Sequence, residues 1–155
     1  MELYHYTNKT DANELLLDCV KYFGANPFSK REKNAASTPR TFFYLNPQQR
    51  EVWFDNSKDL FTAIVDDSQI YDLASDPLNL KSKADRGTFI DMDKLFSLVI
   101  SNGFIGAKFK NVQFEGVIVF TPVTATKVEK FRRETLENKV ITSSLDAPLD
   151  NPPSL

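Results

Sequence analysis

Short apolar segments with the alternation of β-strands recur along most of the chain. Residues 3–7 alternate in this way: His5 shares one face with the other odd-numbered positions, whereas Tyr4 and Tyr6 share the opposite face. Further strands are predicted at 41–45, 60–66, 106–110 and 116–122. This spacing predicts a sheet-rich domain.

Two segments instead carry helix signals. Residues 10–24 have Thr10 or Asp11 as a cap and Gly24 as a stop, with apolar positions at helical spacing between them. Cys19 falls on that apolar stripe and is predicted to be a small buried hydrophobe. The second helix is predicted over 91–103, capped by Asp91 and ended by Gly103.

The segments between these elements are more polar. Residues 25–40 are predicted as a long surface loop, 46–49 as a turn, and 51–54 as either a short strand or a packed loop. Residues 68–80 mix a short extended piece with turns, because Pro77 disfavours a long helix. Residues 127–140 suggest a strand end and a short helix.

The order of the elements predicts an α+β fold, with mostly antiparallel sheets flanked by helices. Residues 1–140 are expected to form one domain. The tail from 141 to 155 is rich in Ser and Pro and poor in aromatic residues, which is typical of disordered segments.

Composition narrows the class further. A chain of 155 residues fits one domain, and thirteen phenylalanines supply a large core. The net charge of −2 leaves no general basic field for nucleic acid. One cysteine and one histidine cannot form an internal disulfide or a usual zinc site. With no secretion signal and no apolar run of about 18 residues, we expect a cytoplasmic protein that binds neither metal nor membrane.

Four motifs occur in an order that resembles the ADP-ribosyltransferase-like family. They are LYHYT at 3–7, RTFFYLNP at 40–47, YDLASDPLNL at 71–80 and NGFIGAKFKNVQFEGVIVFTP at 102–122. The branch in question uses His, Tyr and Glu; it includes the poly(ADP-ribose) polymerases, DNA-modifying toxins and phage anti-CRISPR enzymes. The resemblance implies split sheets that hold NAD in a cleft without a metal.

The first motif supplies the NAD contacts that the resemblance implies on the first strand. His5 would bond a ribose hydroxyl of the adenosine half, Tyr6 would hold the nicotinamide amide through its backbone, and Thr7 could add a hydroxyl contact. Polymerases of the family usually carry glycine where Tyr6 stands. Without the later motifs, the preferred interpretation of His5 is a partly buried histidine paired with a carbonyl.

The second motif would supply the aromatic side chain that stacks on nicotinamide. Phe42 and Tyr44 share one strand face and Phe43 takes the other. We favour Tyr44, which can stack and also use its hydroxyl, with Phe43 as the alternative. Arg40 either meets the NAD phosphates or is a solvated charge at the strand end.

The third motif would supply the catalytic carboxylate. Gln113 and Glu115 lie two residues apart, on one face if extended, directly before an apolar run. Breaking the nicotinamide–ribose bond builds positive charge on the ribose, which a carboxylate stabilises. The Gln-x-Glu pair also resembles the motif of toxin-type ADP-ribosyltransferases, and this resemblance implies a catalytic role for Glu115 and placing of the acceptor for Gln113. Without the resemblance, both fit a solvated turn.

The resulting hypothesis is a mono-ADP-ribosyltransferase that uses NAD to modify a macromolecule, in a toxin, defence or counter-defence role. A protein acceptor is preferred to nucleic acid, because the pI is acidic and the chain is small. The basic residues of 30–33 with Lys108 and Lys110 could form a local patch for nucleic acid, but ordinary surface charge explains them more simply. The alternatives are a non-catalytic binding or inhibitor protein of the same fold, and an NAD glycohydrolase.

Overall fold

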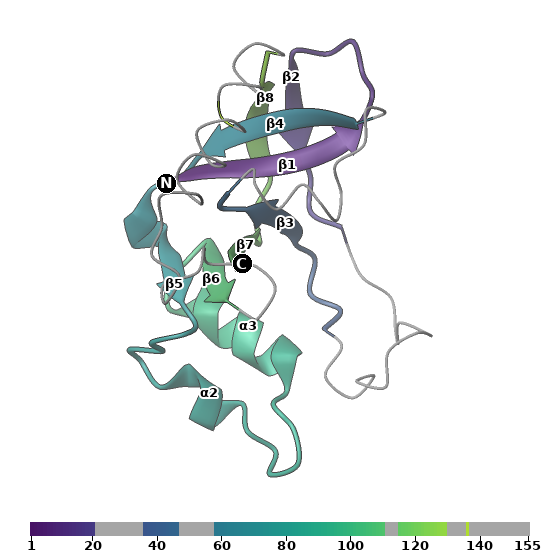
Figure 1. The fold of residues 1–155 in the computed structure, drawn as a ribbon. Coiled ribbons are helices and arrows are strands. Elements are labelled where there is room, and N and C mark those ends of the chain that lie inside the picture. Colours follow the sequence, from purple (N-terminus) through teal and green to yellow (C-terminus); the bar gives the residue numbers. More distant parts are fainter. Residues whose placement is uncertain (21–35, 47–57, 111–114, 130–135, 137–155) are drawn as a thin grey trace, which may run out of the picture.

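The computed structural model describes residues 1–20, 36–46, 58–110, 115–129 and 136 (Figure 1). Its strands are β1 (Glu2–Asn8), β2 (Glu14–Leu17), β3 (Thr41–Tyr44), β4 (Lys58–Ile64), β5 (Ile70–Asp72), β6 (Gly106–Lys110), β7 (Glu115–Val119) and β8 (Val123–Lys127). Its helices are the 3-10 turn η3 (Asp67–Gln69), α2 (Leu80–Lys83) and α3 (Met92–Ser101). The strands form one sheet in the order β2-β8-β4-β1-β3-β7-β6-β5, with only β5 and β6 parallel. The α+β class with mostly antiparallel strands is thus confirmed.

The sheet narrows sharply between β1 and β3. β1 pairs with β4 along its whole length, from Glu2 opposite Ile64 to Asn8 opposite Lys58. Its pairing with β3 on the other side comprises the single register pair Tyr4 and Tyr44. In Figure 1, β1 and β4 cross above β3, while β5, β6 and β7 lie below with α3. The sheet therefore consists of two halves, β2-β8-β4-β1 and β3-β7-β6-β5, joined at a narrow junction.

The two halves are held together by a shared apolar cluster on one face of the sheet, here called the inner face, which is opposite to the face covered by α3. Leu3 and Phe61 from the first half pack with Phe43 and Val117 from the second, and all four have essentially no exposed surface. Leu15 and Leu17 of β2 pack against the same cluster. Burial of these side chains contributes about 1.5–3 kcal/mol each, which compensates for the few hydrogen bonds at the junction.

The opposite face of the second half is covered by α3. The Asp91 side chain caps this helix by accepting a hydrogen bond from the Lys94 backbone at 3.1 Å, and Gly103 follows it at φ 92°. Leu95, Phe96 and Val99 of α3 are buried against the sheet. The helix predicted over 91–103 is confirmed.

The helix predicted over 10–24 is wrong. Residues 14–17 form strand β2, and Val20 makes an isolated bridge with Arg40. The leucine run 15–17 fits both the 3.6-residue period of a helix and the two-residue period of a strand, and pairing with β8 selects the strand. Leu15 and Leu17 pack inward, while Leu16 is 65% exposed. Cys19 is accordingly only half-buried, with its Sγ 3.5 Å from the Val119 carbonyl oxygen.

The other predicted strands are confirmed with shifted ends: β4 spans 58–64 where 60–66 was expected, and β7 spans 115–119 where 116–122 was expected. Strand β8 was not anticipated as a separate strand. The predictions for 51–54 and the tail 141–155, and for most of 25–40, 46–49 and 127–140, fall outside the described residues. Within the described part of the chain, no helix is long and apolar enough to cross a membrane.

The segment YDLASDPLNL is organised around one carboxylate. Asp76 accepts hydrogen bonds from the backbone of Leu80 at 2.8 Å and Lys81 at 3.1 Å, and from the Tyr71 hydroxyl. Asp76 and Asn79 adopt left-handed backbone angles of φ 44° and 54°, a conformation that Asp and Asn tolerate best among residues with side chains. This motif thus has a structural role, because it fixes the turn between β5 and α2.

A second carboxylate anchors the segment that leads into β3. Asp93, in the first turn of α3, accepts hydrogen bonds from the backbones and hydroxyls of both Ser37 and Thr38, at 2.5–3.1 Å. Burial opposes ionisation of Asp93, but these hydrogen bonds outweigh it and lower the pKa of the carboxyl. The start of β3 is therefore tied to the N-terminus of α3.

We predict that Asp93→Asn lowers the free energy of unfolding by about 1–3 kcal/mol at pH 7, because charge-assisted hydrogen bonds are lost. Since the folded-state pKa lies below the ordinary 3.8, this contribution is complete above about pH 5 and disappears as the pH falls through the folded-state value. Denaturant unfolding at pH 7 and pH 3 should show the difference between variant and parent narrowing in acid. Asp11→Asn, at an exposed aspartate, is the control, and an equal effect there would contradict the anchor.

Candidate functional site

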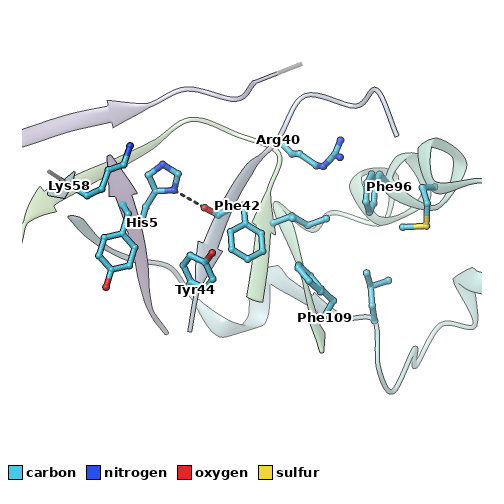
Figure 2. A pocket seen from close by; sticks show the side chains of 11 residues that line it. His5, Arg40, Phe42, Tyr44, Lys58, Phe96 and Phe109 are labelled. Atoms are coloured by element: carbon cyan, nitrogen blue, oxygen red, sulfur yellow. Dashed lines mark hydrogen bonds between the residues drawn. The ribbon is translucent and has the colours of Figure 1, made fainter. Parts of the chain in front are cut away.

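A pocket of about 730 Å³ opens where the two halves of the sheet diverge (Figure 2). Its lining draws on β1, β3, β4, β6, β7 and α3. The lining residues are His5, Tyr6, Arg40, Phe42, Tyr44, Lys58, Leu73, Met92, Phe96, Phe109 and Ile118. Its size and largely aromatic and aliphatic wall are typical of small-molecule sites.

His5 occupies the gap between β1 and β3. Its Nδ1 lies 2.7 Å from the carbonyl oxygen of Phe42, and its ring lies 5.5 Å from that of Phe43. Beyond the Tyr4–Tyr44 pair the two strands have separated, so the imidazole bonds a carbonyl that regular pairing with β1 would have used. This carbonyl contact is one of the two roles that the sequence left open for His5.

The same contact determines what the other ring nitrogen can do. A carbonyl oxygen only accepts, so Nδ1 must carry the proton that is donated. Burial lowers the pKa of His5 below its ordinary 6.5, against the opposing effect of the Phe42 carbonyl. The ring is therefore neutral at pH 7, and its Nε2 is a hydrogen-bond acceptor. The structural contact and a ligand contact are compatible.

Three aromatic rings line the middle of the pocket. Phe42 meets Tyr44 edge to face, with ring centroids 4.7 Å apart, and lies 5.8 Å from Phe109. Phe43 points to the other side of the sheet and is fully buried in the inner cluster. Burial, and then the neighbouring Tyr6, raise the pKa of Tyr44 to about 12, so its hydroxyl stays protonated.

Arg40 lines the end of the pocket next to α3. Its Nη1 donates to the carbonyl oxygens of Ala36 at 3.1 Å and Thr38 at 2.9 Å, and its guanidinium carbon lies 5.5 Å from the centre of the Phe96 ring. In Figure 2 its guanidinium points toward Phe96 and away from His5. The sequence suggested that Arg40 binds phosphate, whereas these contacts make it a structural part of the pocket wall.

Two other predicted site residues, Thr7 and Glu115, are described and are not among the residues that line the pocket. Thr7 donates its hydroxyl hydrogen to the carbonyl oxygen of Asn8 at 2.9 Å. Glu115 is the first residue of β7; it precedes Gly116, whose strand partners Tyr44 and Phe109 both line the pocket. Strand alternation places Glu115 on the inner face with Val117. Gln113 lies outside the described residues.

Several lining residues were not identified from the sequence. Lys58 is the clearest case: it stands just before the predicted strand 60–66, a position that carries no motif. Phe96 and Phe109 were predicted only as members of a helix and a strand. The alternation of 106–110 would have placed Phe109 on a definite face, but nothing in one sequence shows which face borders a cavity.

No group of three or more His, Cys, Asp or Glu side chains in the described segments is arranged to hold a metal ion. Comparison of the chain with protein-family models, with curated proteins and with solved structures finds no match in any of the three. Any function for this pocket must therefore be argued from its own residues.

Gly116 provides the room in which the Phe42 ring lies. A Cβ at this position would come within 2.8 and 2.9 Å of the ring atoms Cε2 and Cζ of Phe42, and 3.1 Å from the Phe43 carbonyl oxygen. Any side chain at residue 116 would push the ring from its place. The absence of a side chain next to Glu115 thus determines the shape of the pocket wall.

We predict that Gly116→Ala lowers the free energy of unfolding by about 1–3 kcal/mol through this overpacking. Adding Phe42→Leu should relieve the contact, so the double variant should lose less than the sum of the two single changes. A double-mutant cycle by denaturant unfolding measures the difference. Strictly additive effects would mean that Gly116 does not position the Phe42 ring.

Proposed function

We propose that the chain is a mono-ADP-ribosyltransferase of the ADP-ribosyltransferase-like fold, which binds NAD in this pocket and modifies a macromolecule. The observation that carries the proposal is His5: it stands at the divergence of the two halves, neutral, with Nδ1 bonded to Phe42 and Nε2 an acceptor. A ribose hydroxyl is the kind of donor that such an acceptor takes.

The described residues of the pocket fit NAD in three respects. The aromatic rings of Tyr44, Phe42 and Phe109 offer stacking surfaces for a planar base. Arg40 and Lys58 bring positive charge, and no carboxylate belongs to the described lining, which suits an anionic ligand. His5 supplies the hydroxyl acceptor. When bound, NAD supplies an ADP-ribosyl group whose bond to nicotinamide is broken in the transfer.

The residues divide the work as follows. His5 and Tyr44 orient the ligand, and the aromatic wall excludes water from the reacting end. Glu115 stabilises the charge that develops on the ribose and takes the proton of the acceptor hydroxyl or amide. Its place beside Gly116, whose strand partners line the pocket, supports this role. The acceptor is proposed to be a protein, with nucleic acid second.

One observation favours a different class. Glu115 is not among the lining residues, and its strand position faces the inner side of the sheet. A non-catalytic protein that binds a nucleotide and acts on a partner would have this arrangement. A glycohydrolase would differ only in passing the ribose to water, so the assays below follow binding, nicotinamide release and label transfer separately.

We predict that Glu115→Ala and the isosteric Glu115→Gln reduce label transfer from NAD to a lysate at least a hundredfold, while NAD affinity changes less than about threefold, because the carboxylate acts in the transition state. The measurement is incorporation of labelled ADP-ribose, with protease and nuclease treatment to identify the acceptor. Glu14→Ala, at the exposed first residue of β2, is the control.

Undiminished transfer by the Glu115 variants would remove Glu115 from the mechanism. Nicotinamide release without label on any macromolecule would indicate a glycohydrolase. NAD binding without either product would support the non-catalytic protein.

We predict that His5→Asn and His5→Ala both weaken NAD binding roughly fivefold to tenfold, the equivalent of one hydrogen bond of about 1–1.5 kcal/mol. An asparagine amide can still donate to the Phe42 carbonyl, so His5→Asn should stay close to the parent in stability, whereas His5→Ala should not. Calorimetric titration and thermal unfolding separate the two effects.

The parent should bind NAD equally well from pH 7 to 8 and more weakly in acid. Protonation turns Nε2 into a donor, and the lowered pKa of His5 places this change below pH 6.5. His5→Asn should lack the change. Equal affinity of parent and His5→Asn at pH 7 would contradict the contact.

A further inference from the structure

We infer that Lys58, which no motif identified, is the residue that binds the diphosphate of the ligand, in the place that the sequence gave to Arg40. The inference rests on the proposed function in taking a dinucleotide as the ligand. It is carried by the positions of Arg40 and Lys58, which both line the pocket, and of Asp59, which lies on the other face of β4.

Arg40 is engaged in the protein itself. Its Nη1 bonds two carbonyl oxygens of the segment before β3, and its plane is held by the Phe96 ring of α3. That segment is in turn anchored by Asp93. To meet a phosphate near His5, Arg40 would have to leave these partners, at a cost of about 1–3 kcal/mol for the carbonyls.

Lys58 is placed at the other end of the pocket, toward His5 (Figure 2). It is the first residue of β4, opposite Asn8 of β1 in the register. Its Nζ donates to Asn8 Oδ1 at 2.6 Å. An ammonium has three donors, so it can keep this neutral partner and still bind an anion.

The neighbouring carboxylate does not neutralise Lys58. Asp59 takes the other face of β4, where it accepts the Thr10 backbone N–H at 3.0 Å and pairs with Lys9 at 3.2 Å and Lys127 at 3.5 Å. Those contacts, first of all the Thr10 bond, lower the pKa of Asp59 and keep it charged toward its own partners. The positive charge of Lys58 is therefore available on the pocket side.

The presence of Lys58 and His5 in one pocket wall matches the covalent structure of a nucleotide. A ribose and its phosphate are adjacent groups, so a side chain that accepts from a ribose hydroxyl and one that donates to phosphate should border the same end of the site. His5 and Lys58 have these two properties and both line the pocket. The aromatic rings beyond them are left for the planar base.

The test uses ADP-ribose, which contains the diphosphate but has no nicotinamide bond to break. Lys58→Met should weaken ADP-ribose binding about tenfold to a hundredfold, and Lys58→Arg should restore most of the affinity, because the contact is a charge-assisted hydrogen bond. Lys83→Met, which removes the same charge from an exposed position in α2, should bind like the parent. Raising the salt concentration should weaken the parent more than Lys58→Met.

ADP-ribose affinity within twofold of the parent for Lys58→Met, or no binding of ADP-ribose by the folded parent, would overturn the assignment. The label-transfer assay keeps this failure distinct from failure of the proposed function. Lys58-dependent binding without transfer would reject the transferase and retain the phosphate contact. Label transfer together with ADP-ribose binding that does not depend on Lys58 would retain the transferase and reject the phosphate contact.

Discussion

The contact between His5 and the Phe42 carbonyl is the interaction on which the arrangement of the site depends. Antiparallel strands normally satisfy each other's carbonyls, and β1 and β3 do so only around Tyr4 and Tyr44. Past that pair, an imidazole takes the place of a backbone donor. The strands can therefore diverge without leaving the carbonyl unsatisfied, and the space between them becomes part of a pocket.

Such a junction is stable only because other interactions hold the two halves in place. The inner apolar cluster joins them, and within the second half Asp93 fixes the segment before β3 to α3. The pocket wall is correspondingly rigid: Phe42 rests on Gly116, and Arg40 rests on Phe96. A preorganised wall of this kind reduces the ordering cost of binding a ligand.

Much of the fold could be predicted from the sequence, because strands such as 41–45 and the capped helix 91–103 have one dominant period. The error at 10–24 arose because the run Leu15, Leu16 and Leu17 fits the period of a helix as well as that of a strand. Only the pairing with β8 decides in favour of the strand. For the site, alternation separated Phe43 from Phe42 and Tyr44 correctly. Lys58 could not be found, since its position at the pocket depends on the pairing of β4 with β1.

The chain has one histidine, and it stands at the centre of this arrangement. In a nitrogen-15 NMR spectrum its imidazole therefore gives one set of ring signals without any need for assignment by mutation. The Nδ1-protonated tautomer has a distinct pattern of chemical shifts, and occupation of the pocket would move the Nε2 resonance most. The residue that bridges the gap between the two halves is thus also a built-in spectroscopic probe of the site.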